Sequence, residues 1–125
     1  MTKIKFTINK DVFVGELRNT PTAKKLLEAL DYQSGLTRWG DEIYFPALIK
    51  TELEKDAKQV VSIGDICFWL GGASLCIFFG PTPISENDEC KAYEKLNLVG
   101  KIVKGDLKRL KAAKTGDKDR VEKIA

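Results

Sequence analysis

The densest group of chemically capable side chains in the sequence begins at Arg38. Arg38 and Trp39 are followed, after Gly40, by two consecutive carboxylates, Asp41 and Glu42. If both carboxylates lie in one strand, they point to opposite faces, because side chains alternate along a strand. They would then not form the paired acid and base of a glycosidase. The structural alternative is that Gly40 and Asp41 form a turn, in which the Asp41 side chain accepts hydrogen bonds from backbone amides.

A second candidate is the segment GPTP, which begins at Gly80. Gly80 permits the close approach of a ligand or of neighbouring backbone, and the flanking prolines hold the hydroxyl of Thr82 in a fixed position. Tyr44, Phe78 and Phe79 could supply aromatic walls for a pocket. The structural alternatives are a rigid loop at the end of a barrel for GPTP and ordinary core packing for the aromatic residues.

Several kinds of chemistry are excluded by composition. The sequence contains no histidine, which removes Ser-His and Cys-His pairs and the commonest metal ligand. Cys67, Cys76 and Cys90 lack CxxC spacing and are too few for a zinc site, and no phosphate-binding glycine motif is present. We therefore expect no metal and no cofactor, and a reducing, cytoplasmic location. Cys67 and Cys76 lie in apolar runs and should be core residues, whereas Cys90, among charged residues, should be exposed.

Length and charge indicate one globular domain over residues 1–125, with 43% hydrophobic and 31% charged residues. Residues 105–125 hold seven basic and four acidic residues, which equals the whole net charge of +3. This basic segment contains no aromatic residue, so we expect a solvated surface and no nucleic-acid partner. No apolar run is long enough for a membrane span, and the first ten residues lack the apolar stretch of a signal peptide.

The elements that position these residues are mostly short strands. Alternating apolar residues predict strands at Lys3–Ile8 and Val12–Leu17. Thr20 and Pro21 mark the N-cap and first residue of an α-helix. A polar loop is predicted over residues 84–95. Further strands are expected within 32–45, 65–70, 74–79, 96–103 and 120–124, and the segments 51–53 and 59–63 flank an exposed charged connection. A second helix is expected over 105–114, with Leu107, Leu110 and Ala113 facing inward.

Two of the strands, Asp65–Leu70 and Ser74–Phe79, are apolar on both faces. Both faces of such strands are buried, here one in the interior of a barrel and the other beneath a further element outside the barrel, such as a helix. Many short antiparallel strands with two separated helices suggest a closed barrel capped by helices.

The turn between these two strands decides how two cysteines face. A two-residue turn at Gly71 and Gly72 would place Cys67 opposite Cys76, whereas a three-residue turn that includes Ala73 would turn the thiols to opposite faces. We expect the longer turn, because the residues that follow Gly72 begin a strand poorly. We therefore expect no disulfide between these cysteines.

Several segments resemble cyclophilins, in the order that the family has them: Gly15–Leu30, Ser74–Gly80, Leu98–Leu110 and the final VEKI. A closer similarity is to small prokaryotic cyclophilin-like proteins, whose signatures resemble Trp39–Phe45, Gly64–Ile66 and Cys76–Pro83. The resemblance implies a mainly β fold, a closed eight-stranded antiparallel barrel capped by two α-helices. It does not imply an activity.

The prolyl-isomerase site of true cyclophilins is mostly missing. Arg38 is a possible match for the family's arginine, and Phe78 or Phe79 for its pocket phenylalanine. The place of the family's histidine is occupied by Leu96, that of its tryptophan lies near Lys91, and no glutamine follows the arginine.

Three functions are compatible with these observations. The first is a binding module for a small molecule or an extended, proline-containing peptide, in which Arg38 and the aromatic residues favour a carboxylate or a proline-like ring. The second is an enzyme, either a degenerate prolyl isomerase or an acid-assisted hydrolase, and the third is a regulatory or protein-interaction domain. If Arg38 is structural instead, we expect it to pair with Asp41 or Glu42. The candidate ligand-binding residues are Arg38, Trp39, Asp41, Glu42, Tyr44, Phe78, Phe79, Gly80 and Thr82.

Overall fold

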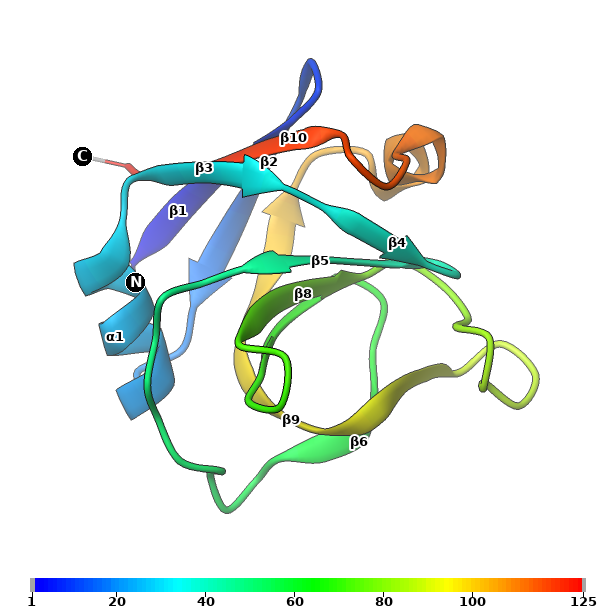
Figure 1. The fold of residues 1–125 in the computed structure, drawn as a ribbon, viewed down its shortest axis with the longest axis horizontal. Coiled ribbons are helices and arrows are strands. Elements are labelled where there is room, and N and C mark those ends of the chain that lie inside the picture. Colours follow the sequence, from blue (N-terminus) through cyan, green and yellow to red (C-terminus); the bar gives the residue numbers. More distant parts are fainter. Residues whose placement is uncertain (1, 125) are drawn as a thin grey trace.

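The computed structural model describes residues 2–124, in which ten strands and two short helices are found. The sheet curls around a core, with the two helices on opposite sides of it (Figure 1). In chain order the elements are β1 (Lys3–Ile8), β2 (Asp11–Leu17), α1 (Pro21–Ala29), β3 (Tyr32–Gly35), β4 (Thr37–Trp39), β5 (Glu42–Pro46), β6 (Lys58–Val61), β7 (Asp65–Trp69), β8 (Ser74–Phe78), β9 (Cys90–Lys104), η1 (Leu107–Ala112) and β10 (Lys118–Lys123).

The sheet is antiparallel, and its hydrogen-bonded path runs β3–β10–β1–β2–β9–β7–β8–β5–β4, with β6 paired to β9 beside this path. The expected closed eight-stranded barrel is therefore corrected: the described chain has ten strands, and hydrogen bonds do not close its sheet. The reason lies at Leu36, the single residue between the two edge strands. Its N–H and C=O bond to Asp117 and Gly116 in the loop before β10, each at 2.9 Å, and not to another strand. The chain itself spans the gap between the edges.

Helix α1 begins where the sequence predicts. The Thr20 hydroxyl accepts a hydrogen bond from the backbone N–H of Ala23 (3.2 Å), and Pro21 is the first helical residue. Ala23 and Leu26 are buried in the main core. The helix therefore covers one open side of the curled sheet.

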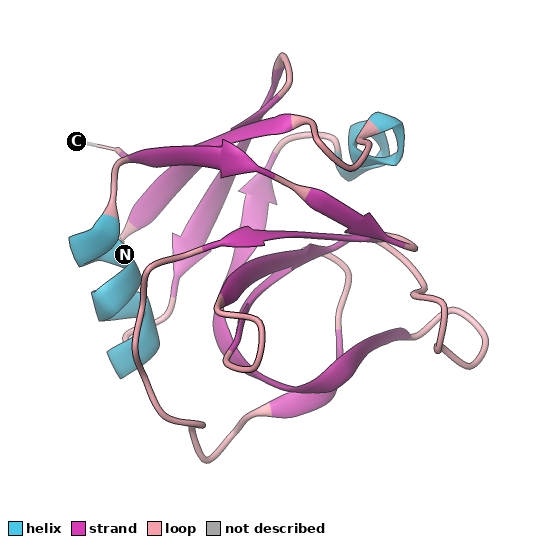
Figure 2. Cartoon of the chain, in the orientation of Figure 1, coloured by secondary structure: helices cyan, strands magenta, loops and turns pink. Residues whose placement is uncertain are grey.

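The second helix, η1, is a 3-10 helix and not the expected α-helix. Its inward residues Leu107, Leu110 and Ala113 are spaced by three, and a 3-10 helix has three residues per turn, so this geometry keeps them on one face. Leu110 and Ala113 are buried, and both helices are short in the cartoon of Figure 2. Within the described chain, neither helix has the length and apolar character needed to cross a membrane.

The central strands β7 and β8 bury residues on both faces, as predicted, and β5 does so too. One face packs in the main core through Ile43, Phe45, Ile66, Phe68, Leu75 and Ile77. The other face belongs to a second, smaller core, formed by Val61, Cys67, Cys76, Phe78, Cys90, Ala92 and Leu96. The outer covering is thus supplied by β6 and β9, not by a helix.

Strand β9 is longer than predicted, because it begins at Cys90 and extends over 15 residues. The expected loop over 84–95 is wrong from residue 90 onward, and Cys90, expected to be exposed, is only 2% exposed. Cys90 and Ala92 alternate inward, but the pairing with β6 is irregular between Lys58 and Val60, and the inward pattern resumes only at Leu96. Because of this irregularity, the alternation of buried and exposed residues that marks a strand is interrupted between residues 92 and 96.

The β7–β8 hairpin has the shorter turn, so the preferred register was wrong. Cys67 pairs directly with Cys76, and the Leu70 carbonyl accepts from the Ala73 N–H (3.2 Å) around the two central glycines. Ala73 takes a φ of 46° within the turn. The Ser74 hydroxyl donates to the Gly72 carbonyl (2.9 Å), and this hydrogen bond stabilises the start of β8. Both cysteines therefore face the second core, and both are free thiols.

Candidate ligand-binding site

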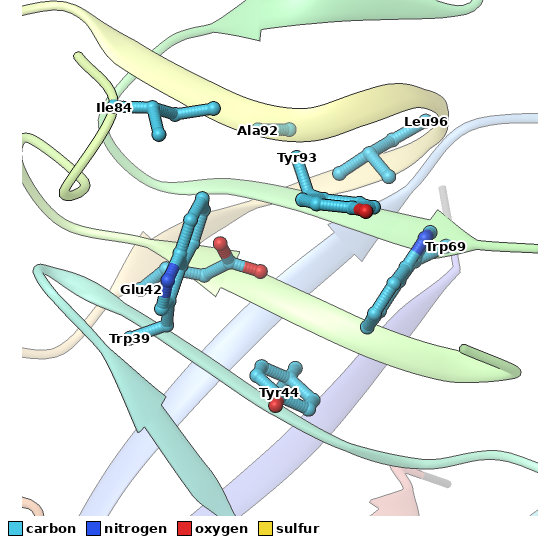
Figure 3. Close-up of a pocket in the computed structure, with 8 residues that line it drawn as sticks. All are labelled: Trp39, Glu42, Tyr44, Trp69, Ile84, Ala92, Tyr93 and Leu96. Atoms are coloured by element: carbon cyan, nitrogen blue, oxygen red, sulfur yellow. The ribbon is translucent and has the colours of Figure 1, made fainter. Parts of the chain in front are cut away.

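A cavity of about 300 Å³ lies beside the second core. Figure 3 shows four large aromatic side chains around the space and the carboxyl group of Glu42 directed into it. The lining consists of Trp39, Glu42, Tyr44, Trp69, Ile84, Ala92, Tyr93 and Leu96. It is mostly apolar, with one acidic group.

The β4–β5 hairpin positions three of these residues. Gly40 and Asp41 form its turn, so Trp39 and Glu42 are direct cross-strand partners. Gly40 has a φ of 61°, a left-handed conformation that favours glycine. Tyr44 follows Glu42 by two positions and therefore lies on the same face of β5.

Two further rings come from β7 and β9. The Trp69 ring centroid lies 5.6 Å from that of Tyr44 and 5.9 Å from that of Tyr93, both in edge-to-face geometry. The Trp69 Nε1–H donates to the carboxylate of Glu94 at 2.6 Å, and Glu94 does not line the cavity. The indole is therefore held in place, and its N–H is already engaged outside the cavity.

The turn between β7 and β8 makes room for this indole. A Cβ atom at Gly72 would overlap several atoms of the Trp69 ring, and one at Gly71 would overlap the Glu94 carboxylate. The two glycines are thus required by close packing against Trp69 and its hydrogen-bond partner.

Glu42 is the charged member of the lining, and only 4% of its surface is exposed. Burial raises the pKa of Glu42 from 4.5 to about 7, and a hydrogen bond with the Cys76 thiol opposes the rise. No Lys or Arg is among the residues that line the cavity. A buried carboxyl without a cationic partner is costly for folding, and such groups cluster at functional sites.

Arg38 lies on the other side of the hairpin and does not line the cavity. Its guanidinium donates to the carbonyls of Gly40 (2.7 Å), Lys111 (2.6 Å) and Ala113 (3.1 Å) and to the Asp41 carboxylate (2.9 Å). Four of its five N–H groups are thereby engaged. Arg38 therefore connects the β4–β5 hairpin to the end of η1, which agrees with the expectation for a structural arginine.

The remaining candidates lie in the same region as Arg38 or beneath the cavity. The Asp41 carboxylate packs against Gly80, where a Cβ would overlap it. Thr82 is buried, and its hydroxyl lies 3.1 Å from that of a serine in its own loop. Phe78 belongs to the second core, while Phe79 belongs to the main core and lies under the Arg38 guanidinium, 5.2 Å from ring centroid to Cζ.

Of the nine candidate residues, the structure brings Trp39, Glu42 and Tyr44 together around the cavity. The other five lining residues come from β7, β9 and the loop before β9, and none of them is among the candidates predicted from the sequence. The contact between Trp69 and Tyr93 depends on the crossing of β9, which sequence spacing does not reveal. The missed residues are Trp69, Ile84, Ala92, Tyr93 and Leu96.

Metal binding has no visible basis in the described residues, since no group of three or more His, Cys, Asp or Glu side chains there could hold an ion. Cys67 and Cys76 are fully buried, and burial raises the pKa of both thiols well above the ordinary value. They are poor nucleophiles for that reason.

The fold and the matched segments define the class of protein. A family model described as cyclophilin-like matches residues 2–122, and the chain belongs to this family. A solved structure is similar over nearly its whole length: the solution structure of the hypothetical protein AF2241 from Archaeoglobus fulgidus, with 32% sequence identity and a TM-score of 0.83. The match covers 98% of this chain and 95% of that one. Among curated proteins, no significant match is found.

Proposed function

We propose that this protein is a binding module whose ligand is a compact small molecule or a single side chain, held in the cavity around Glu42. The observation that carries the proposal is a carboxyl group that is 4% exposed, has no cationic partner in the lining and points into a space bounded by four aromatic rings. Ligand sites of this kind combine apolar walls with a few polar groups that fix orientation.

The size of the cavity favours a compact ligand over a stretch of extended peptide. Its volume of about 300 Å³ lies at the lower end of the range for small-molecule pockets. Tyr93 and Ile84 are 67% and 42% exposed, so they border the opening.

Prolyl isomerisation has less support from the same geometry. The arginine that resembles the family's catalytic residue, Arg38, is engaged in four hydrogen bonds and is absent from the cavity lining. A fixed positive donor aimed at the prolyl group is what electrostatic catalysis of that reaction would use. The cavity presents an acid in its place.

The test is a fragment screen followed in nitrogen-edited NMR spectra. The indole N–H signals of Trp39 and Trp69 report directly on the two sides of the cavity. We expect ligands that shift both signals in the wild type and bind more weakly to Glu42→Gln. The matched control is Glu28→Gln, at an exposed glutamate on α1, which should bind as the wild type does. A screen in which no fragment shifts the Trp39 and Trp69 signals would overturn the proposal.

A further inference from the structure

The charge inside the cavity has one sign. Glu42 contributes a carboxyl, and the other lining residues are aromatic or aliphatic. Aromatic faces carry the negative end of the ring quadrupole and attract cations within about 6 Å. The walls and the carboxyl therefore both favour a positive ligand, opposite to the carboxylate that Arg38 would have favoured.

Apart from Trp69, the side-chain N–H and O–H donors of the lining are limited to the Trp39 indole and the hydroxyls of Tyr44 and Tyr93. The Trp69 N–H donates to Glu94 at 2.6 Å, outside the lining. The backbone groups of β5 and β8 around Glu42 pair with each other, as Glu42 is opposite Phe78 in the sheet. An anionic ligand would thus lose its hydration and would face the Glu42 carboxyl.

The number of hydrogen-bonding groups in the lining also indicates how many alkyl groups the cation carries. A primary ammonium carries three N–H donors, and each must be paired once it leaves water. Glu42 can accept from one or two of them, and most of the lining is apolar. Methyl or methylene groups in place of N–H groups remove this cost and contact the aromatic faces.

We infer that the cavity binds an alkylated ammonium group, tertiary or quaternary, with Glu42 as its counter-ion and Trp39, Tyr44, Trp69 and Tyr93 as its walls; this inference rests on the proposed function. Aromatic residues around a carboxylate recognise such cations through contact with the ring faces and through charge. The cation can belong to a free small molecule or to a methylated lysine side chain of a partner. Both present the same chemistry to the cavity.

The test compares choline with its neutral carbon isostere, in which a tert-butyl group replaces the trimethylammonium group. The two molecules have nearly the same shape, so a difference in affinity reports on charge. We expect wild-type protein to bind choline at least about tenfold more tightly than the isostere, by titration of the Trp39 and Trp69 indole signals. Glu42→Gln should reduce this preference and leave only the smaller part that the aromatic faces supply, and Glu28→Gln should retain it in full.

The possible outcomes separate the inference from the proposed function. Equal binding of choline and the isostere to the wild type would overturn the inference and leave the binding module in place. If neither shifts the indole signals at millimolar concentration, the inference is also overturned, and the fragment screen decides on the binding module. Because these comparisons use the wild type, they hold even if Glu42→Gln fails to fold.

A second arm identifies the source of the cation. A short peptide that carries trimethyllysine is titrated beside the same peptide with unmodified lysine, and both are compared with choline. Tighter binding of the trimethyllysine peptide than of choline supports a protein partner. Tighter binding of choline supports a free small molecule, and a preference for unmodified lysine would overturn the choice of an alkylated cation.

Discussion

Arg38 and Asp41 form an ion pair across the turn of the β4–β5 hairpin, with Nη2 2.9 Å from Oδ1. The same guanidinium donates to the carbonyls of Lys111 and Ala113 at the end of η1. One side of this hairpin is thus fixed to the helix, while its other side presents Trp39 and Glu42 to the cavity. The alternation of side chains along two short strands thus separates the face that is anchored to η1 from the face that lines the cavity.

Replacing Arg38 with Ala should destabilise the protein by about 1–3 kcal/mol, because the partly buried Ala113 carbonyl, two exposed carbonyls and the Asp41 carboxylate lose their donors together. Urea denaturation measures the change in the free energy of unfolding. The control is Arg120→Ala, which removes an exposed ion pair with Glu122 and should cost less than about 1 kcal/mol. Equal stability of the wild type and the Arg38 variant would refute the structural role of this residue.

The free energy of unfolding of the wild type should decrease as pH rises, because Glu42 loses its proton. Its pKa is 4.5 in the unfolded chain and about 7 in the folded protein, so the folded state holds the proton more tightly between these values. The stabilising effect is complete below about pH 4.5, decreases as pH rises to about 7 and is then lost, a change of about 3 kcal/mol. Glu42→Gln should remove this dependence and be more stable than the wild type at about pH 8.

The measurement is the difference in unfolding free energy between wild type and Glu42→Gln at several pH values. Other titratable groups around Glu42 are the thiols of Cys67, Cys76 and Cys90, whose pKa values burial raises further above neutrality. Asp119 is a second buried acid, with its pKa raised to about 6 by burial, but it contributes equally to both proteins. A difference that does not change with pH would show that Glu42 titrates as an exposed glutamate does.

Gly72→Ala should displace the Trp69 indole, because the added Cβ would overlap the ring. We expect a loss of about 1–3 kcal/mol in stability and a shift in tryptophan fluorescence. Gly35→Ala is the matched control, since a Cβ there lies 3.9 Å from its nearest neighbour, the Asp117 carbonyl oxygen. Identical fluorescence spectra for Gly72→Ala and wild type would contradict the packing described for Trp69.

The three thiols should react slowly with Ellman's reagent in the native protein. All three are buried, and burial raises the pKa of each. Since the thiolate is the reactive form, both effects slow the reaction. Denaturant should expose all three at once. Rapid labelling of Cys90 before unfolding would place it on the surface, as its charged sequence context suggests.

Local sequence signals were sufficient to predict the first strand and the start of the first helix. Lys3–Ile8 and the Thr20 cap are recognisable from alternation and from capping chemistry, and both are confirmed. The start of β9 was missed because residues 93–95 are all exposed and the bulge opposite β6 breaks the period of two. The second helix was placed correctly along the chain, but its 3-10 geometry was not predicted, although the spacing by three of its inward residues is compatible with it.

Only the part of the site that lies within one hairpin was predicted from the sequence. Trp39, Glu42 and Tyr44 lie within one hairpin, so the alternation rule places them on one face. Their partners Trp69 and Tyr93 approach through the pairing of β7 and β8 and through the path of β9 across the second core. Contacts made by strand crossing depend on tertiary packing, which residue spacing alone does not encode.

The position of β10 affects when the protein can fold during synthesis. β10 pairs with β1 on one side and with β3 on the other, so the last strand made lies between two of the first. Until residues 118–123 leave the ribosome, β1 and β3 each keep an unpaired edge, and the main core lacks Val121. Such distant pairing slows folding and leaves nascent strands open to association with other chains. The sheet described here can therefore be completed only once residues 118–123 have emerged from the ribosome.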